Sequence, residues 1–179
     1  MLPIVSYSSL FRCLVLWIHY IPLITISSDT VNNEETMRPE KYDTHALMFI
    51  SIILGTLTAF FELIFFALLK IRSSLFVETS MFLYLTFVQL IVIVSIRNQD
   101  HFWKGKRPST LLAIAISLAF ISSLALPYIP ILAGLFSFTP LPLSQVGIIL
   151  GLVVIYLFAL DRVKVWYYRI VERSSRKSV

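Results

Sequence analysis

Two long apolar stretches, residues 75–96 and 110–136, flank the basic segment 97–109. Each stretch is long enough to cross the hydrocarbon core of a bilayer as an α-helix. The chain is 58% hydrophobic and 14% charged, whereas soluble domains carry about 25% charged residues. A soluble fold of this size could not bury so many long apolar runs. The sequence therefore predicts an all-α membrane protein, an antiparallel bundle of four strong transmembrane helices with one weaker N-terminal helix.

Alternation of polar and apolar segments divides the chain into four parts. Residues 1–27 predict a weak N-terminal transmembrane helix, which Pro22 should kink. Residues 28–44 predict a cytoplasmic connection, residues 45–163 a four-helix transmembrane domain, and residues 164–179 a basic cytoplasmic tail. The four spans expected in the transmembrane domain are 45–69, 76–96, 110–126 and 145–160.

The ends of the later spans carry local signals. Pro127 and Pro130 predict the end of the third span, because proline lacks the N–H that a helix needs. Ser144 is a predicted N-cap of the last span, since serine side chains accept hydrogen bonds from the first helical turn. From Asp161 onward we expect a helix that emerges into the inner headgroup region, with Lys164 and other basic residues away from its apolar face.

The distribution of Lys and Arg predicts the orientation of the spans, because these residues concentrate on the cytoplasmic side of membrane proteins. Segments 28–44, 97–109 and 161–179 carry two, four and six of them, against two in the short turn at 70–74. We therefore expect a multi-pass protein of the plasma membrane with a cytoplasmic C-terminus. The basic residues behind the net charge of +5 lie beside the apolar spans. They are therefore explained by the orientation of the protein in the membrane, and we expect no nucleic-acid partner. Membrane lipid is the expected surroundings.

Glu62 is the only acidic residue deep inside a strong span. An ionised carboxylate at the centre of a bilayer costs roughly 2.5–3.5 kcal/mol or more. Glu62 should therefore be protonated, paired or directed into a wet interior. Tyr84 and Gln89 on the returning helix are the nearest candidate partners, and these three are the candidate ion-pathway residues. The alternative is a carboxyl group that is simply hydrogen-bonded inside a helical bundle.

Small residues recur at helical spacing in two spans. Ser51, Gly55 and Ala59 lie four residues apart and share one helix face, and Gly147 and Gly151 make a similar step in the last span. Small side chains at this spacing let a neighbouring helix approach closely. We predict that both sets pack against other helices, although small residues can also face lipid by chance.

The sequence shows no chemistry for catalysis. It has no glycine-rich phosphate loop and no Gly-Lys-Ser/Thr element, and no polar segment is long enough to fold into a catalytic domain. Its three histidines are far apart, so no metal-ligand cluster is expected. The single Cys13 cannot form an intrachain disulfide. We therefore predict no catalytic, cofactor or metal site in this chain.

Six stretches of the sequence are informative when they are considered together and in their order along the chain. They are Ile26–Val31, Arg38–Asp43, Phe76–Ser80 together with Gln89 and Ser95–Asn98, Phe102–Ser109, Leu126–Pro130 and Pro140–Ser144. In this order they resemble the C-terminal membrane region of P-type cation-transporting ATPases, and the resemblance covers about Leu23 to Ile170. The nearest branches are the proton-transporting and magnesium-transporting types. The resemblance implies the last spans of a cation pump, with the same inside and outside assignment as the charge count.

Departures from the resembled family are equally informative. The Asp-Lys-Thr-Gly motif, which carries the phosphorylated aspartate of these pumps, is absent, and so are their nucleotide-binding and actuator domains. His19 and Tyr20 stand where the family usually carries Asn-Asp in its sixth span. The resemblance thus implies an incomplete or split pump, in which only a separate catalytic part binds ATP and magnesium.

Such a chain would need a partner membrane chain or self-association. The alternative is an independent small structural or regulatory membrane protein that associates with a partner membrane protein. Acidic or polar residues that converge inside the bundle would favour the pump.

Overall fold

The computed structural model describes Ile18 and residues 20–25, 44–69, 73–96 and 108–175, and it is helical in each of these parts. Four of its helices are long and apolar enough to cross a membrane, which confirms the predicted all-α membrane fold. The elements are α3 (Thr44–Leu69), α4 (Ser74–Ile96), α5 (Thr110–Ala125), the short 3-10 helix η2 (Leu126–Tyr128), α6 (Pro130–Phe136) and α7 (Leu143–Ser175).

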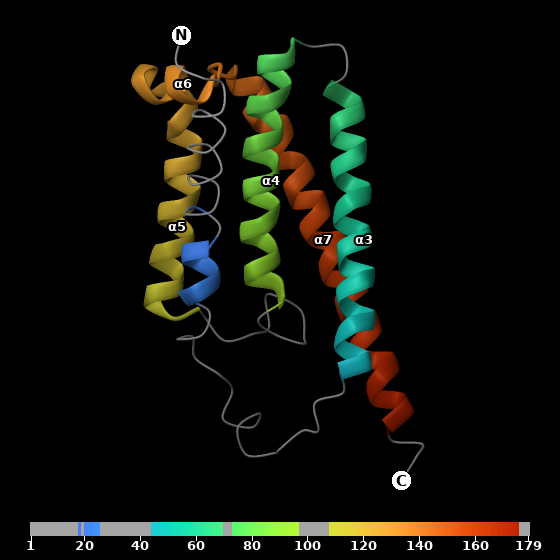
Figure 1. Ribbon diagram of the computed structural model, residues 1–179. Helices are drawn as coiled ribbons and strands as arrows, with labels where there is room; N and C mark the ends of the chain where they lie inside the picture. The colour runs from blue at the N-terminus through green and yellow to red at the C-terminus, as the bar shows by residue number, and fades with distance from the viewer. Residues whose placement is uncertain (1–17, 19, 26–43, 70–72, 97–107, 176–179) are drawn as a thin grey trace.

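Helix α4 is the centre of the bundle. It packs against α3, α5 and α7, and 11 of its 23 residues are buried. Figure 1 shows α3 and α5 on opposite sides of α4, with α7 crossing obliquely behind α4 and α3. Ring contacts join the helices: Phe65 of α3 stacks on Tyr84 at 4.4 Å, and Phe87 stacks on Phe120 of α5 at 4.6 Å.

Local chemistry explains where the helices begin and end. Ser109 caps α5, because its side chain accepts a 3.3 Å hydrogen bond from the backbone N–H of Leu112. Pro127 follows the last α-helical turn of α5, as predicted. Ser137 ends α6 in the left-handed conformation, with φ 58°.

The start of α7 differs from the prediction, whereas the helix continues past Asp161 as expected. The helix begins at Leu143, and the carbonyl oxygen of Pro142 accepts hydrogen bonds from Gln145 and Val146. Ser144 is therefore inside the helix and is not its N-cap. The helix also continues without a break to Ser175, because no proline or glycine interrupts residues 152–175. The last span and the first part of the basic tail form one helix.

The predicted N-terminal segment is described only in part. Ile18 and residues 20–25 are helical, and Ile18 is buried among the core residues of the bundle. The question of whether residues 1–27 cross the membrane lies outside the described residues. So do most of the connection at 28–44 and most of the basic segment 97–109.

Candidate functional site

Polar side chains from three helices lie close together inside the bundle. Tyr84 of α4 and Tyr156 of α7 are almost completely buried, with exposed fractions of 1% and 0%. The hydroxyl of Tyr156 shares a 2.7 Å hydrogen bond with the hydroxyl of Thr58 on α3, in which either group can be the donor. Phe61 meets the ring of Tyr156 edge-on at 5.5 Å. We call Tyr84 and Tyr156 the phenol pair.

Glu62 lies at the edge of the phenol pair. It follows Thr58 by four residues, so the two side chains share a face of α3. Its side chain is partly buried, and its carboxylate interacts electrostatically with both phenol hydroxyls. Within the described parts of the chain, the carboxylate makes no hydrogen bond and no ion pair. A carboxylate beside hydroxyl groups offers the oxygen ligands that a proton or a hard cation requires.

The structure brings together only part of the predicted set. The buried Tyr84 lies within electrostatic range of the partly buried Glu62, whereas Gln89 is exposed on α4. Thr58 and Tyr156 are members that the sequence analysis missed. A signal was present for Tyr156, because it is the only hydroxyl-bearing residue in the apolar run 146–160. Only the packing of α7 on α3 shows that Tyr156 meets Thr58.

The two sets of small residues lie on exposed surface. Ser51, Gly55 and Ala59 are exposed along α3, and the helical repeat places Glu62 on the same stripe. A methyl group added at Gly55, Gly147 or Gly151 would meet no atom within 4 Å. These residues therefore do not form contacts between the helices that the structure describes. Their predicted role in helix packing would require a further helix, and it stays a prediction.

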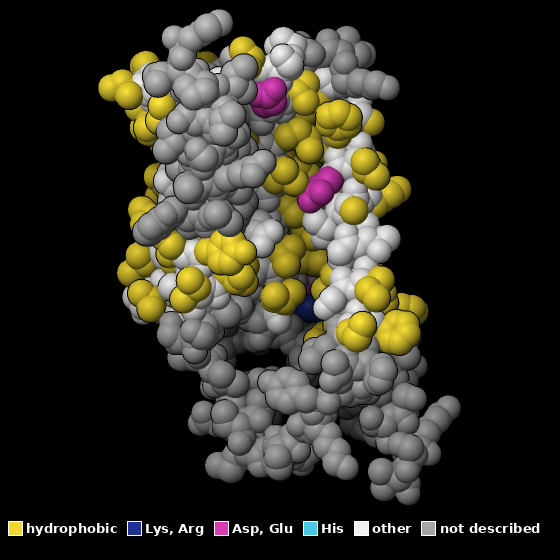
Figure 2. Space-filling view, in the orientation of Figure 1, with side chains coloured by type: hydrophobic (Ala, Val, Ile, Leu, Met, Phe, Trp, Pro, Cys, Tyr) yellow, Lys and Arg dark blue, Asp and Glu magenta, His cyan; other side chains and the backbone are white. Residues whose placement is uncertain are grey.

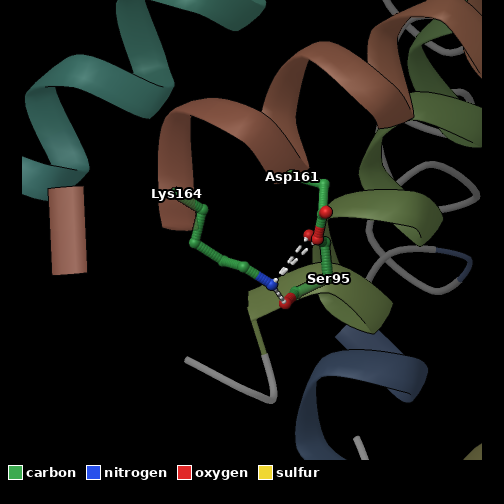
Figure 3. Close-up of polar contacts among 3 residues, drawn as sticks. All are labelled: Ser95, Asp161 and Lys164. Carbon is green, nitrogen blue, oxygen red and sulfur yellow. Dashed lines mark hydrogen bonds and ion pairs between the residues drawn. The ribbon is translucent and has the colours of Figure 1, made fainter. Parts of the chain in front are cut away.

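A second polar group lies where α4 ends (Figure 3). Lys164 of α7 points at the last turn of α4, and its Nζ donates a 2.7 Å hydrogen bond to the backbone oxygen of Ser95. The same Nζ is 3.5 Å from Oγ of Ser95 and 3.4 Å from Oδ1 of Asp161. The side chains of Lys164 and Asp161 are both 1% exposed. We call these three residues the lysine cluster.

The lysine cluster satisfies the end of α4. Helix α4 stops at Ile96, so the carbonyl of Ser95 is among the last four, which have no partner within the helix. That end also carries a partial negative charge, which a cation stabilises. Lys164 supplies both the donor and the charge, and Asp161 neutralises the lysine. The prediction that Lys164 lies away from the packing surface is therefore wrong, because a paired charge can be buried.

A family described as "Cation transporting ATPase, C-terminus" matches residues 13–166. The chain belongs to this family. The match begins at Cys13, so it extends the resemblance, which began near Leu23, by ten residues toward the N-terminus. A comparison with curated proteins found no match.

Membership of the family identifies the bundle. It is a C-terminal membrane region of a P-type cation-transporting ATPase, as the resemblance implied, and no finding favours the alternative of an independent structural protein. The matched residues include the phenol pair, Glu62 and the lysine cluster. Both polar groups therefore lie within the part of the chain that the ATPase family defines.

The environment of Glu62 predicts that folding does not need its charge. We expect Glu62→Gln to insert and fold, and to change the free energy of unfolding by less than about 1 kcal/mol. The reason is that the substitution keeps the shape and removes an ionised group from the bilayer interior. Thermal unfolding of the purified protein in detergent measures this effect, with Glu78→Gln on the exposed side of α4 as the control. Loss of insertion only in Glu62→Gln would contradict the prediction.

The lysine cluster predicts a large and specific loss of stability. Lys164→Met removes the cation that lies 3.4 Å from the buried Asp161 carboxylate, so the free energy of unfolding should fall by about 3–5 kcal/mol. Arg162→Met removes a positive charge from an exposed position of α7, and it should change the free energy of unfolding by less than about 0.5 kcal/mol. Adding Asp161→Leu to Lys164→Met should restore most of the loss, since no charge then remains buried. Equal stability of Lys164→Met and Arg162→Met would show that the cluster does not support the fold.

Proposed function

We propose that this chain forms the membrane-embedded transport part of a cation pump, and that it works only with a catalytic part that binds ATP and magnesium. The observation that carries the proposal is the Glu62 carboxylate beside two buried phenols in a bundle of the cation ATPase family. A carboxylate in the middle of a span is the usual mark of an ion or proton pathway. In this role Glu62 holds the cation or proton, and the phenol pair lines its surroundings.

The open side of Glu62 indicates what else the pump needs. Most described side chains of α3 are exposed, including Ser51, Gly55 and Ala59, and the partly buried Glu62 continues this stripe. If lipid covered this stripe, the carboxylate would face hydrocarbon at considerable cost. A further transmembrane helix would instead pack closely on the small residues and enclose Glu62. We infer that this helix belongs to a second membrane chain or to a second copy of this one.

The type of cation and the orientation are finer parts of the proposal. The six resembled stretches support a proton- or magnesium-transporting pump in the plasma membrane. Figure 1 supports a cytoplasmic C-terminus, because the end of α4, the start of α5 and the last turns of α7 lie at the same end of the bundle. The basic segments that adjoin these ends would then all face the cytoplasm, in keeping with the preference of Lys and Arg for that side.

The proposal that this chain needs a separate catalytic part can be tested in two experiments. The purified chain in liposomes with magnesium and ATP should release no more phosphate than protein-free vesicles, because phosphoryl transfer needs groups that cradle the nucleotide phosphates. In the second experiment, residues 13–166 replace the corresponding region of a cation-transporting ATPase. This chimera should show ATP-driven cation uptake, and its Glu62→Gln variant should lose most of it.

Each experiment has an outcome that would overturn the proposal. ATP-driven cation uptake by the chain alone would show that no separate catalytic part is needed. Equal uptake by the chimera and its Glu62→Gln variant would show that Glu62 is not part of the pathway. Glu78→Gln in the same chimera is the matched control, because this carboxylate is exposed near the start of α4.

The α3 stripe predicts association through one face. Two populations of the chain, labelled with donor and acceptor dyes, should show energy transfer in liposomes, because a second copy covers the stripe when no other helix is present. Gly55→Ile should lower the transfer strongly, since the added side chain prevents close approach of the helices. Thr56→Ile adds a similar bulk one position along α3 and should not lower it. Equal transfer in both variants would exclude this face as the contact.

A further inference from the structure

Helix α6 and its neighbouring residues carry no charge at all. No Asp, Glu, Lys, Arg or His occurs between Arg107 and Asp161, although this stretch contains the connection between two spans. The helix itself is Pro-Ile-Leu-Ala-Gly-Leu-Phe, without one polar side chain. A connection that lies in water normally contains polar and charged residues. This composition indicates that the connection between α5 and α7 does not lie in water.

The connection is held firmly on the end of α4. The hydroxyl of Thr79 on α4 accepts a 3.0 Å hydrogen bond from the backbone N–H of Thr139, and the rings of Phe82 and Phe138 lie 4.8 Å apart. The hydroxyl of Tyr128 donates a 2.8 Å hydrogen bond to the backbone oxygen of Leu141. These contacts fix the orientation of α6, so the same side chains always point away from the bundle.

Helix α6 has an inner and an outer side. Leu132, Ala133 and Phe136 pack against the core, whereas Ile131 and Leu135 point outward, and Ile131 is 83% exposed. We call Ile131 and Leu135 the α6 face. Figure 1 shows α6 lying across the end of the bundle, nearly perpendicular to α5, and Figure 2 shows hydrophobic side chains over this end. The outer side of α6 is thus apolar, as are the sides of the spanning helices.

Span lengths give the depth of α6. The membrane-spanning stretch of α5 and η2 runs from Thr110 to Tyr128, 19 residues. At 1.5 Å per residue it is about 28 Å long, close to the hydrocarbon thickness of about 30 Å. The span is therefore complete at Tyr128, and the next span starts at Leu143. Helix α6 lies between these points, at the depth where acyl chains meet headgroups.

We propose that the α6 face is a lipid-binding surface, inserted at the boundary between the acyl chains and headgroups of one leaflet. The perpendicular orientation suits this depth, because a helix parallel to the membrane plane keeps its apolar side chains among the upper acyl carbons. A second copy of the chain is a poorer occupant. A stable protein interface takes about 20–30 residues a side, and α6 has seven residues. The proposal does not rest on the proposed pump function.

The depth of single tryptophans in lipid vesicles tests the proposal. Trp17, Trp103 and Trp166 are first replaced by phenylalanine, and one tryptophan is then placed at Ile131, at Leu135 or at a control position of the full chain. Ile155 on α7 is an exposed control about 18 Å along that helix from Leu143, and therefore near the bilayer centre. Phe138 is a buried control at the end of the bundle. Fluorescence is measured with lipids brominated near the headgroup or deep in the chain, and with aqueous iodide.

The expected pattern differs at each position. Tryptophan at 131 or 135 should be quenched more by shallow than by deep bromine and little by iodide, whereas tryptophan at 155 should show the reverse order of the two lipids. Tryptophan at 138 should respond weakly to every quencher. Strong iodide quenching at 131 without lipid quenching would place the α6 face in water. Protection of 131 from all quenchers would mean that protein covers it, and either result overturns the proposal.

Discussion

The packing of α7 along α4 is the contact on which the other parts of this bundle depend. It is the most extensive contact between any two helices of the described chain, and 11 of the 23 residues of α4 are buried in the bundle. Apolar packing alone lets two helices slide in lipid, because hydrocarbon surrounds them wherever they lie. The lysine cluster removes this freedom. Lys164 reaches the carbonyl of Ser95 only at the observed register of α7 on α4, whereas its partner Asp161 lies three residues before it on the same helix.

Once α7 is fixed, it determines the surroundings of Glu62. Tyr156 lies two helical turns before Lys164 on α7, and it reaches Thr58 of α3 from that position. Tyr84 approaches from α4 and stacks on Phe65. The phenol pair thus requires three helices in register. A carboxylate beside two buried hydroxyls is a suitable site for a proton or cation, and the exposed stripe of α3 leaves it accessible to a further helix.

The two ends of the bundle differ in a way that a bilayer explains. At one end, α7 continues past the lysine cluster as a basic helix, whereas at the other end a connection without charge folds over α4. The uncharged connection is ordered by hydrogen bonds between side-chain hydroxyls and the backbone and by an aromatic contact. This asymmetry matches the tendency of basic residues to remain on one side of a membrane.

Apolar runs of spanning length determined the helices, because every backbone polar group in lipid must be satisfied within its own segment. The starts of α3 and α5 and the ends of α3, α4 and α5 therefore lie within a few residues of the sequence predictions. The start of α7 was less predictable, since Pro142 and Ser144 are both plausible boundaries and only the observed hydrogen bonds distinguish them. Family membership could also be recognised from ordered stretches, although residues 13–22 were not part of that recognition.

The sequence by itself thus determined the number of strong spans, their lengths and the isolation of Glu62 among apolar residues. Tertiary structure alone decided which polar residues meet. It brought Tyr84 and Tyr156 to Glu62, left Gln89 exposed, and buried Lys164 with Asp161. The physical reason is that the hydropathy of a segment, which predicts whether it spans the membrane, depends on the residues of that segment alone. A hydrogen bond or ion pair between spans depends on the rotation and depth of two helices, which are set by packing over their whole length.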